Sequence, residues 1–140
     1  MDRNRNLTAN IPENLTSCGA PEWWLAQFYQ TNSFAGVALG DTDGDGMNGC
    51  AEYTAGTSPT NPLSLLDLKR LASSTNALWV YWSSVTSRVY SVFRSGNLAT
   101  GWPVQPLTSG MPGNVSGTNA YPDTTMPTPP VFYRIGVQKP

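Results

Sequence analysis

The pattern of apolar and polar residues changes its period near Pro62, a little before the middle of the chain. Before this point, four apolar residues share one face at helical spacing: Trp24, Leu25, Phe28 and Tyr29. Pro21 and Glu22 suit the first turn of a helix, where a missing N–H has no cost and a negative charge is favourable. We therefore predict a short helix over residues 20–29, whose aromatic rings either pack against the rest of the protein or stack on sugar rings.

A second short helix is predicted from Cys50 to Ala55. Gly56 suits the position just after a helix end, and Pro59 stops any continuation. Because isolated helices of this length are marginal in water, neither helix should be stable without further contacts.

After Pro62, apolar and polar residues alternate in short runs that are separated by turn residues, which is typical of strands. The predicted strands are 65–71, 77–82, 88–94, a weak edge strand at 104–107 that contains Pro106, and 131–137. In the second strand, Leu78, Val80 and Trp82 should face one side of the sheet. The fold class is therefore mainly β, with a small antiparallel β-sandwich over residues 63–140.

The segment between the two predicted helices is the most informative part of the sequence. The residues at the ligand positions 1, 3, 5, 7 and 12 of an EF-hand type loop are Asp41, Asp43, Asp45, Met47 and Glu52. Met47 would bind through its backbone carbonyl, and Gly46 takes the turn position. Carboxylates at this spacing repel one another unless a hard cation lies between them, and Ca²⁺ accepts such a set more readily than Mg²⁺ does.

Two features of this loop leave alternatives open. A cluster of Asp-Gly dipeptides also forms turns without any metal, although four of the nine acidic residues fall in these twelve positions. Loop position 9 is Gly49 and not a ligand residue, while Asn48 lies one position early. This predicts either an additional water at the ion or a shifted loop into which Asn48 reaches.

Composition indicates the class of protein. Only 12% of the residues are charged and the net charge is −1, so nucleic acid and anionic membranes are poor partners. No apolar run approaches the roughly twenty residues that span a bilayer. The many Pro and Gly residues favour a turn-rich, secreted β protein. No signal peptide is visible at the start, so we expect either a removed leader or a fragment of a longer chain.

Catalytic chemistry is not expected. The chain has no histidine, which excludes Ser-His, Cys-His and imidazole-ligated zinc sites. The acidic residues outside the loop are scattered and show no paired arrangement: Asp2, Glu13, Glu22, Asp67 and Asp123. We predict that the protein is not an enzyme.

The two cysteines, Cys18 and Cys50, lie on either side of the first helix and the acidic loop. A disulfide between them would close a ring of about thirty residues and contribute roughly 3–4 kcal/mol. The alternative is two buried thiols in a reducing compartment. An extracellular calcium site and an even number of cysteines favour the disulfide.

Three regions follow from these patterns: a polar, extended arm at 1–18, a helix and calcium-loop unit at 19–62, and the β-sandwich at 63–140. The arm has few apolar residues, chiefly Leu7, Ile11 and Leu15. Their spacing of four would place all three on one side of a strand.

The stretch from Asp41 to Tyr53, followed by Gly-Thr-Ser-Pro at 56–59, resembles the thrombospondin type 3-like calcium repeats of secreted bacterial proteins. The later strands more loosely resemble fibronectin type III-like modules, through Trp82, Tyr90 with Val92, and Phe-Tyr-Arg at 132–134. The resemblance implies calcium ligands at the loop positions named above. It also implies a further edge strand, whereas this chain ends shortly after the Phe-Tyr-Arg strand.

The expected function is that of a secreted or cell-surface, calcium-stabilised structural module without enzymatic activity. Its partners would be copies of itself, joined into a filament when each subunit adds an arm to the open sheet edge of its neighbour. The alternative is a carbohydrate-binding or anchoring module of a larger hydrolase or adhesin, with exposed aromatic rings on a glycan. A spacing domain in an adhesin would need no ligand besides calcium.

Overall fold

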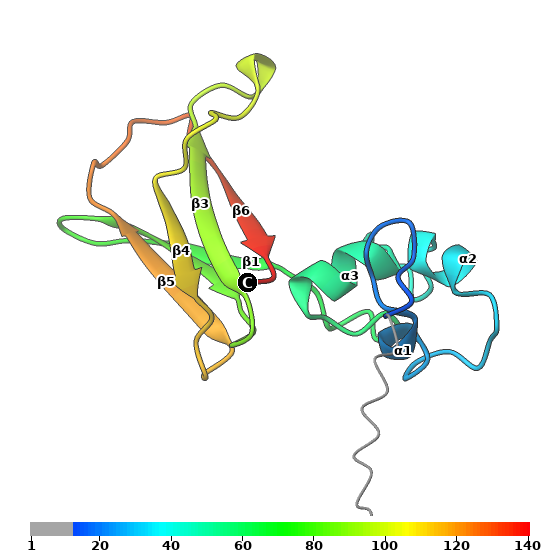
Figure 1. Cartoon of the computed structure of the whole chain (residues 1–140). Helices are drawn as coiled ribbons and strands as arrows, with labels where there is room; N and C mark the ends of the chain where they lie inside the picture. The colour runs from blue at the N-terminus through cyan, green and yellow to red at the C-terminus, as the bar shows by residue number, and fades with distance from the viewer. Residues whose placement is uncertain (1–12) are drawn as a thin grey trace, which may run out of the picture.

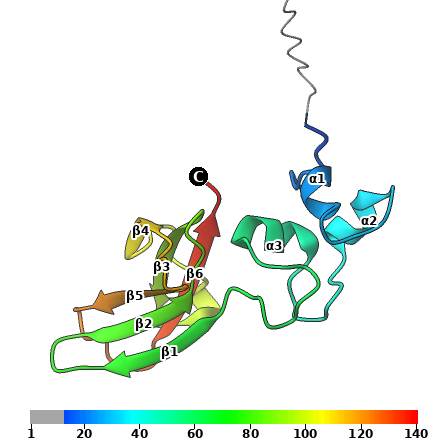
Figure 2. The same cartoon turned by 90° about the horizontal axis from the view of Figure 1, so that it is seen from below.

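The computed structural model describes residues 13–140 and places all α-helices before all strands (Figure 1). The α-helices are α1 at Glu22–Leu25, α2 at Phe34–Leu39 and α3 at Gly49–Ala55. The helices form one lobe, and the strands form a second lobe beside it (Figures 1 and 2). Both predicted helices are present, but α2 was not predicted, because its sequence Phe-Ala-Gly-Val-Ala-Leu has no polar face.

Within residues 13–140, six strands form two three-stranded antiparallel sheets, which confirms a mainly β fold with a small sandwich-like arrangement. The strands are β1 Leu68–Ser73, β2 Leu78–Ser83, β3 Val89–Ser95, β4 Thr108–Pro112, β5 Thr118–Asp123 and β6 Phe132–Gln138. One sheet has the order β1-β2-β5 and the other has the order β4-β3-β6. A short 3₁₀ helix, η1, spans Leu98–Thr100 between β3 and β4.

The sequence located four of these strands to within a few residues. The weak strand predicted at 104–107 was wrong, because the edge strand β4 starts only at Thr108. Leu107 contributes just one bond to this edge, from its N–H to the Val92 carbonyl at 2.7 Å. Strand β5 was missed because its sequence Thr-Asn-Ala-Tyr-Pro-Asp has little apolar alternation, and its pairing with β2 is what makes it a strand.

The core of the sandwich lies between the two central strands. Val80 and Trp82 of β2 and Val92 of β3 are fully buried, and Tyr90 of β3 is 1% exposed. The rings of Trp82 and Tyr90 pack across the two sheets with their centroids 6.0 Å apart. The predicted alternation of β2 is therefore confirmed at Val80 and Trp82.

The helical lobe is joined to the N-terminal segment by a disulfide between Cys18 and Cys50, as the sequence favoured. Residues 13–18 also fold back on α1, because Leu15 forms an isolated antiparallel bridge with Pro21 and the Thr16 N–H donates to the Ala20 carbonyl at 2.9 Å. These residues therefore belong to the helical lobe and not to an extended arm. The rest of the predicted arm, at 1–12, lies outside the described residues.

A buried carboxylate links the two sheets of the sandwich. Asp123 at the end of β5 is 1% exposed, and its Oδ2 accepts bonds from Arg94 Nη1 at 2.6 Å and from the Tyr133 hydroxyl at 2.7 Å. Thr125 donates to its Oδ1 through the hydroxyl at 2.7 Å. Burial alone would raise the pKa of Asp123, but the bonds from Thr125, Tyr133 and Arg94 outweigh it and hold the pKa below its ordinary value.

We expect Asp123→Asn to lower the free energy of unfolding by roughly 3 kcal/mol at pH 7, because it leaves Arg94 without its counter-charge in a partly buried site. A lowered carboxyl pKa stabilises the folded state above the unfolded pKa near 4, and this contribution is lost as the pH falls below that value. Urea unfolding at pH 7 and pH 3 should therefore show a difference between wild type and variant that shrinks in acid. The control is Asp67→Asn, whose exposed pair with Lys69 should change stability by less than about 1 kcal/mol at either pH.

Candidate metal site

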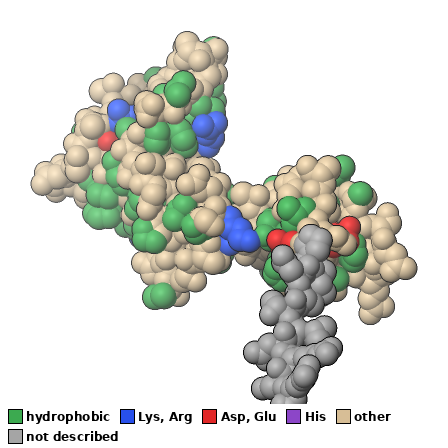
Figure 3. All heavy atoms as spheres, in the orientation of Figure 1, with side chains coloured by type: hydrophobic (Ala, Val, Ile, Leu, Met, Phe, Trp, Pro, Cys, Tyr) green, Lys and Arg blue, Asp and Glu red, His purple; other side chains and the backbone are tan. Residues whose placement is uncertain are grey.

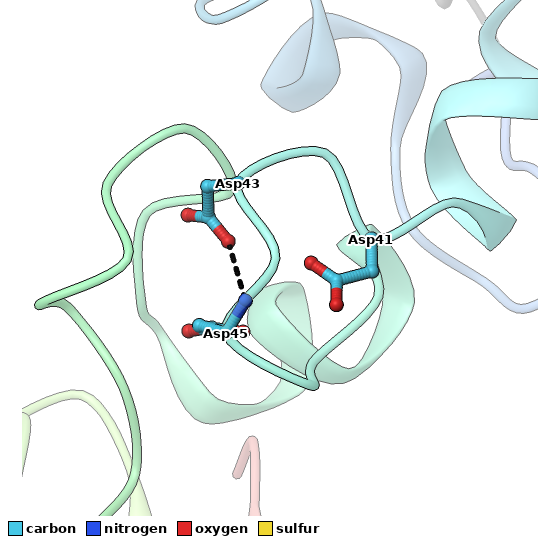
Figure 4. Close-up of side chains that lie close together, drawn as sticks. All are labelled: Asp41, Asp43 and Asp45. Atoms are coloured by element: carbon cyan, nitrogen blue, oxygen red, sulfur yellow. Dashed lines mark hydrogen bonds between the residues drawn. The ribbon is translucent and has the colours of Figure 1, made fainter.

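The connection from α2 to α3 brings three aspartates together. One carboxylate oxygen from each of Asp41, Asp43 and Asp45 lies within 4.8 Å of the others, an arrangement that could hold a metal ion (Figure 4). The loop turns tightly because Gly44 and Gly46 adopt positive φ angles of 79° and 94°, which side chains rarely tolerate. The glycines of the Asp-Gly dipeptides therefore fix the backbone that gathers the carboxylates.

The aspartates also shape the loop through bonds to its backbone. Asp41 accepts the N–H groups of Gly44 at 2.8 Å and Gly46 at 3.0 Å. The Asp45 N–H donates to Asp43 Oδ1 at 3.3 Å, and the Met47 N–H donates to Asp45 Oδ1 at 2.7 Å. These bonds use one oxygen of Asp43 and one of Asp45 and leave the second oxygen of each side chain for another partner.

Three carboxylate oxygens in this region are buried without a hydrogen-bond donor among the described residues: Asp43 Oδ2, Asp45 Oδ2 and Glu52 Oε1. Leaving charged acceptors buried and unpaired costs several kcal/mol, so native proteins rarely do so. Three such oxygens in one loop and its exit helix could form the donor set of a hard cation.

Glu52 lies on α3 and is 1% exposed. Its pKa is raised to about 7, first by burial and then by the negative charges of Asp43, Asp45 and Asp41. The structure brings Asp41, Asp43 and Asp45 together, whereas Glu52 lies outside this close cluster. The roles of Glu52 and of the Met47 carbonyl as ligands stay predictions.

The structure also explains the irregular end of the loop. Asn48 is the N-cap of α3, where its side-chain oxygen accepts the Ala51 N–H at 2.9 Å. Gly49 is buried against α2, and a Cβ there would lie 2.9 Å from the Val37 carbonyl oxygen. Loop position 9 is glycine because α2 and α3 approach closely, and Asn48 serves the helix instead of reaching into the loop.

Helix α3 connects this site to the sandwich. Arg88 is 7% exposed, and its guanidinium donates to the carbonyls of Tyr53 at 2.5 Å and Thr54 at 2.6 Å. These carbonyls lie in the last turn of α3, where the helix itself supplies no donors. Lys139, just after β6, contacts the Tyr53 ring, with its ammonium nitrogen 4.7 Å from the ring centroid.

Figure 3 shows the charge distribution that accompanies this junction. On the face shown, acidic side chains gather on the helical lobe, and a basic group lies where the two lobes meet. Nothing in the sequence pattern indicated that Arg88 is a capping residue, because its partners are 34 and 35 positions away along the chain. Only the tertiary arrangement reveals this contact.

Comparison with known proteins gives no assignment: no protein-family model, no curated protein and no solved structure matches this chain. Within residues 13–140, no helix is long and apolar enough to cross a membrane. The likeness to thrombospondin type 3-like repeats and fibronectin type III-like modules therefore stays a prediction that rests on the motifs alone.

We expect a divalent cation to release about one proton when it binds at pH 6 and much less at pH 8. In the ion-free protein, the raised pKa of Glu52 keeps this residue largely protonated at pH 6, and a cation must displace that proton. Calorimetric titration in two buffers of different ionisation enthalpy measures the number of protons released. Glu52→Gln should release none at pH 6, and an equal release from wild type and variant would contradict the role of Glu52.

Proposed function

We propose that this chain is a non-enzymatic, calcium-stabilised structural module of a secreted or cell-surface protein, and that it assembles with copies of itself by strand addition. The observation that supports this proposal most directly is the set of buried, unpartnered oxygens of Asp43, Asp45 and Glu52. A structural role for the ion follows from where these residues lie, in the loop between α2 and α3 and in α3 itself, the helix that contacts the sandwich through Arg88.

The donor set favours calcium over magnesium. All the predicted ligands are oxygens, from Asp41, Asp43, Asp45, Glu52 and the Met47 carbonyl, and Ca²⁺ accepts six to eight of these in flexible geometry. Mg²⁺ requires a smaller octahedral shell and retains its waters. Asp43 and Asp45 each already accept a loop N–H with one carboxylate oxygen, so a larger cation fits the remaining, less regular set of oxygens.

The ion would stabilise an otherwise weak lobe. Helices α1, α2 and α3 have only 4, 6 and 7 residues, too few to be stable by themselves. The disulfide between Cys18 and Cys50 holds one end of this lobe, and a cation would hold the loop at the other. A disulfide and a site for abundant extracellular calcium both agree with a location outside the cell.

A non-enzymatic role agrees with the chemistry of the described residues. The most strongly perturbed carboxylate outside the loop, Asp123, is fully engaged by Arg94, Thr125 and Tyr133 in the link between the sheets. The sequence also has no histidine.

Assembly is supported by the small sandwich, whose sheet β4-β3-β6 ends on one side in the seven-residue strand β6. Unpaired edges of this kind accept strands from other chains, and repeated addition would produce a filament.

A glycan-binding role is the second candidate, and one observation favours it. The rings of Trp79 and Tyr81 on β2 are stacked, with centroids 6.2 Å apart and planes at 29°. They point away from the core side of β2, and the Arg70 guanidinium lies 4.2 Å from the Tyr81 ring centroid. Two stacked rings beside a hydrogen-bond donor could bind a sugar chain, although a wider platform of three rings would support this role more strongly.

Calcium binding is tested by the variant Asp43→Asn with Asp45→Asn. At a calcium concentration a hundred times Kd, the ion should stabilise the wild type by about 2.7 kcal/mol and should leave the double variant unaffected. Thermal unfolding in calcium and in EGTA measures the difference, with Asp67→Asn as a control that retains the calcium response. A wild-type melting temperature that is the same in calcium and EGTA would remove the support for this proposal.

The glycan candidate is tested by pull-down with insoluble cellulose and chitin. If the stacked rings bind sugar, Trp79→Ala with Tyr81→Ala should lose retention, because each ring supplies a stacking surface. The control Trp23→Ala removes an exposed ring, 57% accessible, on the helical lobe and should be retained like the wild type. Equal behaviour of all three proteins would exclude this surface as the binding site.

A further inference from the structure

In the part of the chain that the structure describes, the two sheets have four edge strands, and three of them are protected against pairing with another chain. Strand β1 has the charged Lys69 together with a register shift between Leu68 and Arg70. Strand β4 is only five residues long and ends in Pro112, with a second register shift opposite β3. Strand β5 contains Pro122, which has no N–H to offer. Charges, proline, bulges and short length are the usual means by which natural sheets prevent edge-to-edge association.

Strand β6 has none of these protections. Its seven residues pair with β3 in an unbroken register from Phe132 to Gln138, and no proline occurs within it. Its single charge, Arg134, lies over the rings of Phe93 and Trp102, at 4.6 Å and 5.0 Å from their centroids. The Arg134 side chain therefore packs on the outer face of its own sheet and does not prevent another strand from pairing with β6.

The direction of the backbone groups on β6 follows from the bonds of β3. The carbonyls of Arg88 and Val92 accept the N–H groups of Gly113 at 2.9 Å and Leu107 at 2.7 Å, on the side of β4. In an antiparallel sheet, successive residues point their backbone groups to opposite neighbours. The residues between them, such as Ser91, therefore point to β6.

Ser91 is opposite Gly136 in the register of β3 and β6, so the N–H and C=O of Gly136 are directed to β3. The same alternation directs the backbone groups of Tyr133, Ile135 and Val137 to the open side. The side chains of these three residues pack against the core. A strand added here would bond to their backbone and extend the core with its own apolar side chains.

Helix α3 limits the open length. It lies beside the C-terminal end of β6 (Figure 1), where Lys139 contacts the ring of Tyr53. The unprotected stretch therefore runs from Phe132 to about Ile135. A short donor segment of about four or five residues can cover this length.

We propose that this edge of β6 accepts residues 7–11 from a second copy of the chain. The segment reads Leu-Thr-Ala-Asn-Ile, in which apolar and polar residues alternate strictly, as in a strand with one face on a core. It has no charge, and Pro12 follows it directly, so the pairing would end there. This inference rests on the proposed self-assembly and specifies both of its contact surfaces.

The acceptor is tested with Ile135→Pro, which removes an N–H from the open edge without removing a bond to β3. The matched control is Ile135→Ala, which removes most of the same side chain but keeps that N–H. In calcium, sedimentation velocity should show that the proline variant loses assembly and that the alanine variant assembles like the wild type. Loss of assembly in both variants would attribute the effect to the core and would overturn the assignment of this edge.

The donor is tested with Leu7→Asp plus Ile11→Asp. Its matched control is Thr8→Asp plus Asn10→Asp, which adds the same two charges to the other side of the alternating pattern. The first variant should lose assembly and the second should keep it. Assembly that survives in both donor variants would overturn the proposed segment.

A mixture of the two defective proteins distinguishes this mechanism from general destabilisation. The donor variant Leu7→Asp plus Ile11→Asp retains its acceptor edge, and Ile135→Pro retains its donor, so together they should form a one-to-one heterodimer and nothing larger. A mixture that stays monomeric would overturn the pairing. Continued assembly of Ile135→Pro would overturn this inference while self-assembly stands, whereas a wild type that is monomeric at every concentration would overturn both proposals.

Discussion

The structure depends on how the chain deals with the negative charge in the loop between α2 and α3. Asp41, Asp43 and Asp45 lie together, and Glu52 is buried within reach of their field. Backbone N–H groups satisfy some of the carboxylate oxygens, but three oxygens remain buried without a donor. A protein can tolerate this arrangement if a proton or a cation compensates it, and burial together with the neighbouring aspartates raises the pKa of Glu52, which favours its protonated form. Removal of the compensating charge should therefore loosen the loop and the short helices beside it.

Helix α3 connects the acidic loop to the sandwich. Three consecutive residues of α3 have different partners. The pKa of Glu52 is affected by the aspartates of the loop, the Tyr53 ring contacts Lys139, and the Thr54 carbonyl accepts a bond from Arg88. A seven-residue helix thus contacts both lobes, and its final carbonyls are capped by a side chain from the other lobe. We therefore expect the order of the loop to affect how α3 contacts the sandwich, which agrees with the proposed structural role.

The sandwich itself is stabilised by two different kinds of contact. Apolar packing of Val80, Trp82, Tyr90 and Val92 fills its centre, and the bonds of Asp123 join the sheets at one end. The edge strands of the sandwich differ in their protection. Strands β1, β4 and β5 have features that oppose pairing with another chain, and β6 has none. An exposed, regular edge is a risk of aggregation unless it has a partner. The absence of protection on β6 agrees with the proposed assembly.

The sequence by itself determined the features that depend on local spacing. The alternation in β2, the glycine after α3, and the acidic loop were readable because their residues are neighbours along the chain. The tertiary structure decided what depends on distant partners: β5 is a strand because β2 lies beside it, Gly49 is required because α2 approaches α3, and Arg88 caps a helix 34 positions away. Residues 13–18 likewise fold back because of the disulfide and the bridge to Pro21. Periodicity reports which face of an element is apolar, but it does not report which element will cover that face, because that choice is made by the packing of the whole chain.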